Sequence, residues 1–330
     1  MAVAGTLNNR RSGLSRLFEA YGQEFVVLSA IVALFIIVGA VNPRFLGNNN
    51  LVNIFSGNAY IAVAAIGMSL VIITGHIDVS VGSLIGVLAT IAGTLAVGGY
   101  PIWVAWTVPV LVGVAVNTFV GALIAYAKIP SIVVTLGMLS ILKGGLISVT
   151  GGTWITNMPP EFFIAQARLF GIPAPVYFMV ILTVLMAVWM RYASLGRAIY
   201  AVGGNPEAAR AAGLYPERVC VLAFAMHGFF AGIAALLFAT QLQVIQSTVP
   251  PNLELTVITA SVIGGVSILG GTGTVVGSTL AAILFACISS ALVFLNVSAY
   301  WLRAVLGLLI LATVLADMAR RRRHRAAGRL

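Results

Sequence analysis

Long apolar runs alternate with short polar connections along almost the whole chain. A helix that crosses a lipid bilayer needs about 20 mostly apolar residues. Ten runs approach this length, at about 25–41, 59–74, 80–98, 102–126, 131–149, 175–190, 219–240, 255–269, 275–294 and 301–317. The pattern therefore predicts an all-α, polytopic membrane protein with about ten transmembrane helices, some of them short or broken.

The composition agrees with lipid as the main solvent. Only 8% of the 330 residues are charged and 60% are hydrophobic, whereas soluble domains carry about 25% charged residues. An ordinary soluble enzyme is excluded, because too few charges remain to cover its surface. No stretch is long and polar enough for a soluble domain, so we expect a single transmembrane domain over residues 1–330.

The positive charges predict the orientation, because cytoplasmic connections carry an excess of Lys and Arg. If the N-terminus is inside, six arginines in the last eleven residues join eight other basic residues there, fourteen in all, against Arg44 and Arg168 outside. The eight are Arg10, Arg11, Arg16, Lys128, Arg191, Arg197, Arg210 and Arg218. Both termini should be cytoplasmic, with tails at 1–24 and 318–330 and a large cytoplasmic loop at 191–218. This placement also argues against nucleic-acid binding, despite the net charge of +10.

A first candidate segment, Gly-His-Ile-Asp-Val-Ser-Val-Gly-Ser at 75–83, separates two apolar runs. Ionisable groups inside a membrane are costly and usually functional. The residues that we single out as a hinge or as part of a translocation path are Asp78, Ser80, Gly82 and Ser83. A simpler interpretation remains open, in which Asp78 or Ser80 only caps the helix that starts near Val81.

A second candidate segment lies in the 191–218 loop and has the signals of a complete short helix. Asn205 suits the N-cap, Pro206 the first turn, and Gly213 the C-terminal stop. The whole candidate set is Asn205, Pro206, Glu207, Ala208, Ala209, Arg210 and Gly213. Such a rigid surface helix with small side chains fits a groove on another protein. An interfacial helix without a partner is the alternative.

A third candidate segment, residues 264–278, is rich in glycine. It contains no Gly-Lys-Ser/Thr and lacks the strand–turn–helix setting of a nucleotide site. Glycines that break a span or allow close helix packing explain it better. The candidate hinge residues are Gly264, Gly265, Gly270, Gly271 and Gly273. We expect the same packing role for the Gly228-x-x-x-Gly232 pair.

Several single residues outside the three candidate segments carry weaker predictions. Lys143 lies within a predicted span and is a candidate for hydrogen bonding inside the protein. His227 is expected to be a satisfied packing histidine, and Glu254 to start a span at the outer edge of the membrane. Cys220 and Cys287 are expected to be small buried hydrophobes. We expect no metal site and no cofactor.

These segments resemble one known family, the membrane permease subunits of bacterial ATP-binding-cassette importers for monosaccharides. Residues 75–83 are similar to its Gly-Gly-Ile-Asp-Leu-Ser-Val-Gly-Ser motif, although His76 replaces the second glycine. Residues 201–210 resemble its cytoplasmic coupling segment, residues 254–277 its glycine signature, and residues 130–137 a further family run. The resemblance covers nearly all of residues 45–318.

The resemblance implies about ten helices, a permease dimer (a homodimer or a heterodimer), a cytoplasmic ATPase pair and a periplasmic sugar-binding protein. The chain itself is then a transport subunit of the inner membrane and not an enzyme, because it has no ATPase site. Gly-Gly-Thr-Trp-Ile at 151–155 is more similar to the autoinducer-2 and rhamnose members than to the ribose members. Two alternatives remain: a secondary transporter driven by an ion gradient, and a membrane scaffold without cargo. The first is disfavoured because Asp78 is the only acid expected deep in the spans.

Overall fold

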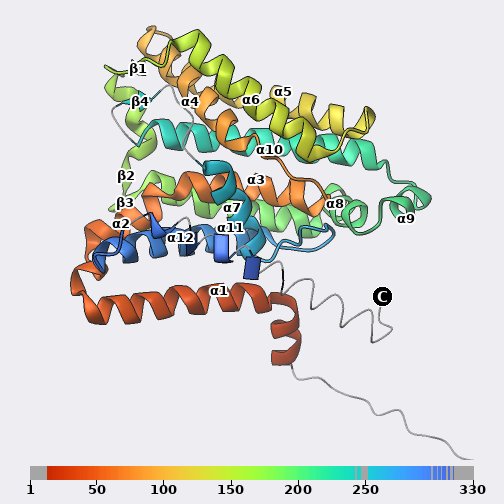
Figure 1. The fold of residues 1–330 in the computed structure, drawn as a ribbon, viewed down its shortest axis with the longest axis horizontal. Helices are drawn as coiled ribbons and strands as arrows, with labels where there is room; N and C mark the ends of the chain where they lie inside the picture. Colours follow the sequence, from red (N-terminus) through yellow and green to blue (C-terminus); the bar gives the residue numbers. More distant parts are fainter. Residues whose placement is uncertain are drawn as a thin grey trace, which may run out of the picture.

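The structure is a computed structural model. It describes residues 13–241, 244–246, 252–298, 300–302, 304–305, 307–309, 311–312 and 315, and for residues 13–21 it describes only the backbone. Most of the long helices run side by side, with short strands at one end of the molecule and α8 and α9 at the other (Figure 1). The predicted all-α class is confirmed.

The described helices begin and end as follows: α1 Gly13–Val41, α2 Asn48–Gly57, α3 Ala59–Ile73, α4 Val81–Val97, α5 Ile102–Tyr126, α6 Ser131–Thr150, α7 Ala174–Tyr192, α8 Ser194–Gly204, α9 Pro206–Ala211, α10 Pro216–Ala239, α11 Leu253–Ile263 and α12 Val275–Phe294. Two 3₁₀ turns, η1 and η2, lie at Pro43–Leu46 and Pro160–Gln166. Proline stands at the N-cap of α5 and α6 and in the first turn of α9 and α10. There its missing N–H costs no helical hydrogen bond.

Seven described helical segments are long and apolar enough to cross a membrane. They are Gly22–Val41, Asn48–Ile73, Ile102–Tyr126, Ser131–Thr150, Ala174–Tyr192, Pro216–Ala239 and Val275–Phe294. Val81–Val97 and Leu253–Ile263 are shorter apolar helices. Nine of the ten predicted runs are thus helical, and the tenth, 301–317, is described only in part, with each described residue in helical conformation. The count of ten is therefore approximate.

Two predicted spans have the wrong limits. The run at 59–74 continues a helical segment that already begins at Asn48, with only a break at Asn58 between α2 and α3. The run at 255–269 ends as a helix at Ile263, because glycines follow it. At 1.5 Å per residue, α11 is only about 16 Å long, which is half the hydrocarbon thickness of a bilayer.

Helix α3 forms the centre of the molecule. It packs against α10, α12, α11 and α7, and 83% of the most apolar window of the Asn48–Ile73 segment is buried. A helix that is apolar on all sides belongs in such a position. By contrast, only 11% of the corresponding window of α6 is buried. Helix α6 therefore lies at the periphery of the chain.

Helices α5 and α10 approach closely because glycines face one another. A Cβ atom on Gly113 would lie 2.6 Å from the carbonyl oxygen of Gly228, and one on Gly232 would lie 2.6 Å from the Cα of Val110. The packing role predicted for Gly228 and Gly232 is confirmed. Backbones that approach so closely are typical of helix pairs in membranes.

Two small sheets lie at the end of the molecule opposite α9 (Figure 1). Strands β1 (Trp154–Ile155) and β4 (Ile245–Gln246) are antiparallel. Strands β2 (Arg168–Leu169) and β3 (Ile172–Pro173) are also antiparallel. The β1–β4 pair therefore joins the polar stretch at 151–174 to the region before α11, whereas β2 and β3 form a hairpin within that stretch.

The α5–α10 contact predicts an asymmetric response to added methyl groups. Gly232→Ala should lower the free energy of unfolding by about 1–3 kcal/mol, because the new methyl group overlaps α5. Thermal unfolding in detergent would measure this loss as a lower Tm. Gly144→Ala in α6 is the matched control, because no atom lies within 4 Å of the place that its new Cβ would take. Equal Tm values for the two variants would contradict the packing.

Candidate functional site

Helix α9 is the short helix predicted from residues 205–213. The Asn205 side chain accepts a hydrogen bond from the Ala208 N–H at 3.0 Å, and Pro206 occupies the first turn. At the other end Gly213 has a φ of +86°. The Gly213 N–H donates to the Arg210 carbonyl, and the Leu214 N–H donates to the Ala209 carbonyl. This pair of bonds is a Schellman motif, so both ends of α9 are capped by local chemistry.

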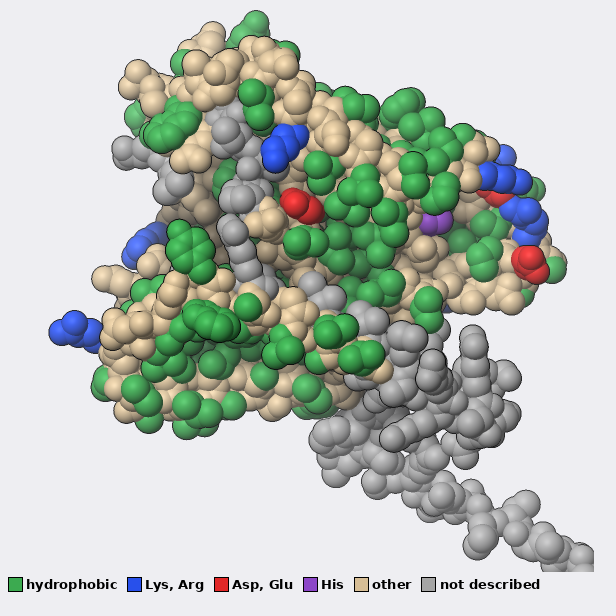
Figure 2. All heavy atoms as spheres, viewed as in Figure 1, with side chains coloured by type: hydrophobic (Ala, Val, Ile, Leu, Met, Phe, Trp, Pro, Cys, Tyr) green, Lys and Arg blue, Asp and Glu red, His purple; other side chains and the backbone are tan. Residues whose placement is uncertain are grey.

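The side chains of α9 divide into a buried anchor and an exposed surface. Ala209 is buried, whereas Glu207, Ala208 and Arg210 are exposed. Arg210 forms an ion pair with Glu217 in the first turn of α10, which ties the two helices together. Figure 2 shows basic and acidic side chains gathered at this end of an otherwise largely hydrophobic face. The helix is therefore available for contact with another protein.

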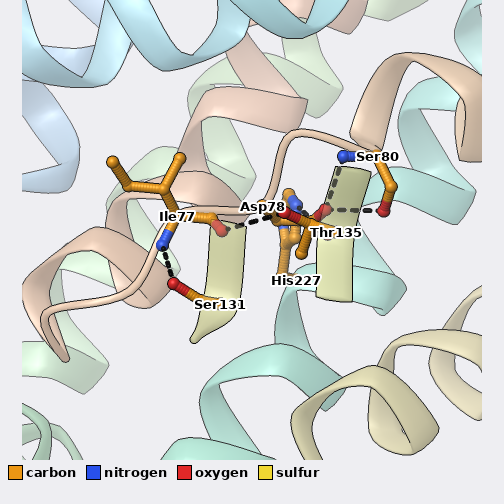
Figure 3. Close-up of polar contacts among 6 residues, drawn as sticks. All are labelled: Ile77, Asp78, Ser80, Ser131, Thr135 and His227. Atoms are coloured by element: carbon orange, nitrogen blue, oxygen red, sulfur yellow. Dashed lines mark hydrogen bonds and ion pairs between the residues drawn. The ribbon is translucent and has the colours of Figure 1, made fainter. Parts of the chain in front are cut away.

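The first break in the helices lies between α3 and α4, at residues 74–80. Gly75 has a φ of +87°, and the chain then runs without helical structure to the start of α4. The Ile77 N–H donates to the Ser131 hydroxyl, and the Thr135 hydroxyl donates to the Ile77 carbonyl, each at 3.4 Å (Figure 3). Two hydroxyls in the first two turns of α6 thus bond both backbone polar groups of Ile77, which have no helical partner.

Asp78 is fully buried in this break. Its Oδ1 accepts hydrogen bonds from the Ser80 N–H at 2.7 Å and from the Ser80 hydroxyl at 2.6 Å. Ser80 occupies the N-cap position of α4 but makes no capping bond of its own. Ser80 thus stands at the predicted cap position, but the predicted capping bond to α4 is not found, because Asp78 accepts its hydrogen bonds from Ser80 instead. Gly82 and Ser83 follow in the first turn of α4 and are buried.

The second carboxylate oxygen of Asp78 faces a histidine. His227 Nε2 on α10 lies 3.4 Å from Asp78 Oδ2, and both side chains are fully buried (Figure 3). Neither ring nitrogen of His227 makes a hydrogen bond to the described residues. The prediction of a satisfied packing histidine is therefore wrong. Sequence reasoning missed this pair because the two residues stand far apart in the chain, and no local pattern joins them.

The second break separates α11 from α12, at residues 264–274. Four of the predicted glycines adopt a positive φ: Gly265 +98°, Gly270 +81°, Gly271 +77° and Gly273 +139°. Gly264 has an ordinary φ, but a Cβ there would lie 2.5 Å from the Ser278 Cα. Thr274 then caps α12, because its hydroxyl oxygen accepts the Gly277 N–H at 3.1 Å.

Helix α1 holds the second break from the other side. The Gln23 amide donates to the Ile263 carbonyl at 3.0 Å, and the Thr274 hydroxyl donates to the Glu24 carboxylate. A Cβ on Gly265 would lie 2.8 Å from the Gln23 side chain. Helix α1 therefore satisfies or covers part of this irregular backbone, as non-helical backbone in a membrane protein requires.

The two breaks meet, but only some of the predicted residues take part. The Gly271 N–H donates to the Ile73 carbonyl at the end of α3, at 2.8 Å. Gly270 packs on Gly75. By contrast, Gly264, Gly265 and Gly273 contact α12, α1 and Val266. The predicted hinge residues therefore form two groups, one of which joins the breaks.

Glu254 lies in the first turn of α11 and is half-buried. Its backbone N would be 3.0 Å from a Cβ on Gly82, so α11 begins beside the first turn of α4. Gly93, about three turns later in α4, lies beside Ile155 and Ile245 of the end strands. Glu254 thus starts a helix as predicted, and its place at the outer edge of the membrane stays a prediction.

Three other predictions concern single residues. Lys143 is exposed on α6 and makes no hydrogen bond to a described residue, so the expected bonding within the chain is not found. Cys220 and Cys287 are buried and free, as predicted. Among the described residues, no group of three His, Cys, Asp or Glu side chains is arranged to hold a metal ion.

Comparison with known proteins identifies the family. A family model described as branched-chain amino acid transport system / permease component matches residues 50–314. The autoinducer 2 import system permease protein LsrC of Salmonella typhi is 38% identical over 301 residues, which cover 91% of this chain and 87% of the relative. The proteins of the same name from Escherichia coli O9:H4 (strain HS) and Shigella flexneri are 36% identical, with 91% and 88% covered. No solved structure matches the chain.

The matched region contains all three candidate segments, and the relatives align over nearly their whole length. The predicted resemblance to the permease subunits of sugar-type ATP-binding-cassette importers is therefore confirmed. The chain belongs to the family of branched-chain amino acid transport system permease components, and it is a multi-pass membrane permease.

Proposed function

We propose that this chain carries a monosaccharide or a similar small polyol across the bacterial inner membrane. Rhamnose and autoinducer-2 are the leading candidates, the latter because the relatives are permeases of autoinducer 2 import systems. The chain works as a transport subunit without its own ATPase site. Its partners are a cytoplasmic ATP-binding-cassette ATPase, a periplasmic sugar-binding protein and a second permease subunit, either identical or a paralogue.

The observation that carries this proposal is helix α9. It is capped at both ends, exposed along Glu207, Ala208 and Arg210, and tied to α10 by an ion pair. A helix with these properties suits docking into a groove of a partner protein. In the proposed orientation α9 and both termini lie on the cytoplasmic side. Fourteen basic residues then lie inside, and cytoplasmic connections of membrane proteins carry an excess of Lys and Arg.

The mechanism follows from this arrangement. When ATP closes the ATPase dimer, α9 moves with the ATPase surface. Helices α8 and α10 are continuous with α9 through short turns, so they transmit the movement into the membrane. The helix breaks allow the spans to change their relative positions, and a path between the two permease subunits opens alternately to each side. Asp78, Ser80, Gly82 and Ser83 belong to the moving part of this path or to its hinge.

A second candidate function rests on the buried pair of Asp78 and His227. Ionisable pairs within the spans are typical of carriers that couple transport to protons or sodium. Such a carrier would need no ATPase, and α9 would be an ordinary interfacial helix. The two functions differ in their energy source, so one transport assay separates them.

One prediction concerns the energy source of transport. Proteoliposomes that hold the permease with its cognate ATPase and binding protein should accumulate labelled cargo only when ATP is present on the ATPase side. The cargo for this assay is the ligand that the binding protein retains from a panel including rhamnose and autoinducer-2. A proton or sodium gradient without ATP should drive no uptake. Gradient-driven uptake without ATP would reject the importer and favour the second candidate.

A further prediction concerns the docking of the ATPase on α9. Glu207→Trp should reduce ATP-driven uptake by about tenfold or more, because a bulky side chain separates α9 from the ATPase groove. Co-purification of the ATPase with the tagged permease should weaken in parallel, while the Tm of the permease stays unchanged. Glu161→Trp is the matched control, since Glu161 is also exposed in the first turn of a short helix, at the opposite end of the molecule. Equal uptake by the two variants would count against docking at α9.

A further inference from the structure

The end of α8, just before α9, touches the end of α3 through backbone atoms. Gly203 lies so close to the Ile73 carbonyl that a Cβ on Gly203 would overlap this oxygen. The same Cβ would lie 2.8 Å from the Gly271 nitrogen, which donates its hydrogen bond to that same carbonyl. Three segments that are distant in sequence therefore meet at one peptide group.

The second break completes this contact. A Cβ on Gly270 would lie 2.8 Å from the Gly203 carbonyl oxygen and 3.0 Å from the Gly75 nitrogen, and one on Gly271 would lie 2.7 Å from the Gly204 Cα. Gly270 and Gly271 also have positive φ values of +81° and +77°, which side chains disfavour. We call the set Ile73, Gly203, Gly270 and Gly271 the glycine junction.

One side-chain hydrogen bond reinforces the junction. The Tyr200 hydroxyl, on α8, donates to the Gly273 carbonyl in the second break at 2.9 Å. Burial, together with the nearby Glu24 carboxylate, raises the pKa of the Tyr200 phenol above its ordinary value. The phenol therefore keeps its proton at physiological pH and remains a donor. Helix α8 is thus fastened to both sides of the junction.

Contacts between backbones transmit displacement efficiently, because no side-chain rotamers can absorb it and the packed atoms cannot be compressed. We propose that Gly203 and Gly271 are positioning residues, through which a displacement of α9 reaches both helix breaks at once. This inference rests on the proposed function, in which an ATPase moves α9. It adds the route into the membrane and the reason why the breaks move together.

A competing route exists through α10. The Arg210–Glu217 ion pair ties α9 to the start of α10, and His227 further along α10 faces Asp78 in the first break. This route reaches only the first break directly. Variants can therefore separate the two routes, because the glycine junction and the Asp78–His227 pair share no residue.

The test compares neighbouring glycines in the complete importer, with permease, ATPase and binding protein in proteoliposomes. Gly203→Ala should preserve co-purification with the ATPase and ATP hydrolysis, but lower the cargo taken up per ATP about tenfold. Gly204→Ala should behave as the wild type, because nothing lies within 4 Å of a Cβ at that position. His227→Asn should have a smaller effect on uptake per ATP than Gly203→Ala.

Tyr200→Phe keeps the test decisive if Gly203→Ala fails to fold. It removes one hydrogen bond while keeping the ring, and it should lower uptake per ATP about threefold at an unchanged Tm. Folded Gly203→Ala or Tyr200→Phe with wild-type uptake per ATP would overturn the inference and leave the proposed function intact. Loss of coupling in His227→Asn alone would assign transmission to α10 instead. Absence of ATP-driven uptake in the wild type would reject the proposed function, and the inference with it.

Discussion

Every peptide group inside the bilayer must find its hydrogen-bond partner within the protein, and the rest of this structure depends on that constraint. Each break in a helix frees backbone groups that lipid cannot satisfy. Here the first break is closed by the hydroxyls of Ser131 and Thr135. The second is closed by the Ile73 carbonyl, which accepts the Gly271 N–H. Both breaks thus depend on partners from other elements, the first on α6 and the second on the end of α3.

The same constraint explains where the charges stand. Exposed charges gather beside α9, where water can solvate them, whereas Asp78 lies buried beside His227. A buried pair of this kind contributes little net stability, but removing one member leaves an unpaired group in a medium of low dielectric. The pair lies where α10 meets the first break, and the hydrogen bonds that Ser80 donates hold the other carboxylate oxygen of Asp78.

Features with a local cause could be predicted from the sequence. The helical runs follow from apolar residues over a sufficient length, and α9 follows from an N-cap, a proline and a terminal glycine that act within a few residues. The partner of His227 could not be predicted. It depends on how one helix crosses another, and the interacting residues are separated by many turns of chain. The exposure of Lys143 has the same origin, because only the packing of α6 decides which of its faces is covered.

The sequence by itself thus determined the solvent of this protein, the positions of most of its helices, the short exposed helix between two spans, and the family to which its motifs point. The tertiary structure alone decided which glycines meet. Gly270 and Gly271 join the end of α3 and the end of α8, whereas Gly264 packs on α12 and Gly265 on α1. Glycine permits a close approach of backbones wherever it stands, but because it has no side chain, the sequence does not indicate which segment it contacts. The crossing of the helices supplies the partner, so the junction became visible only in three dimensions.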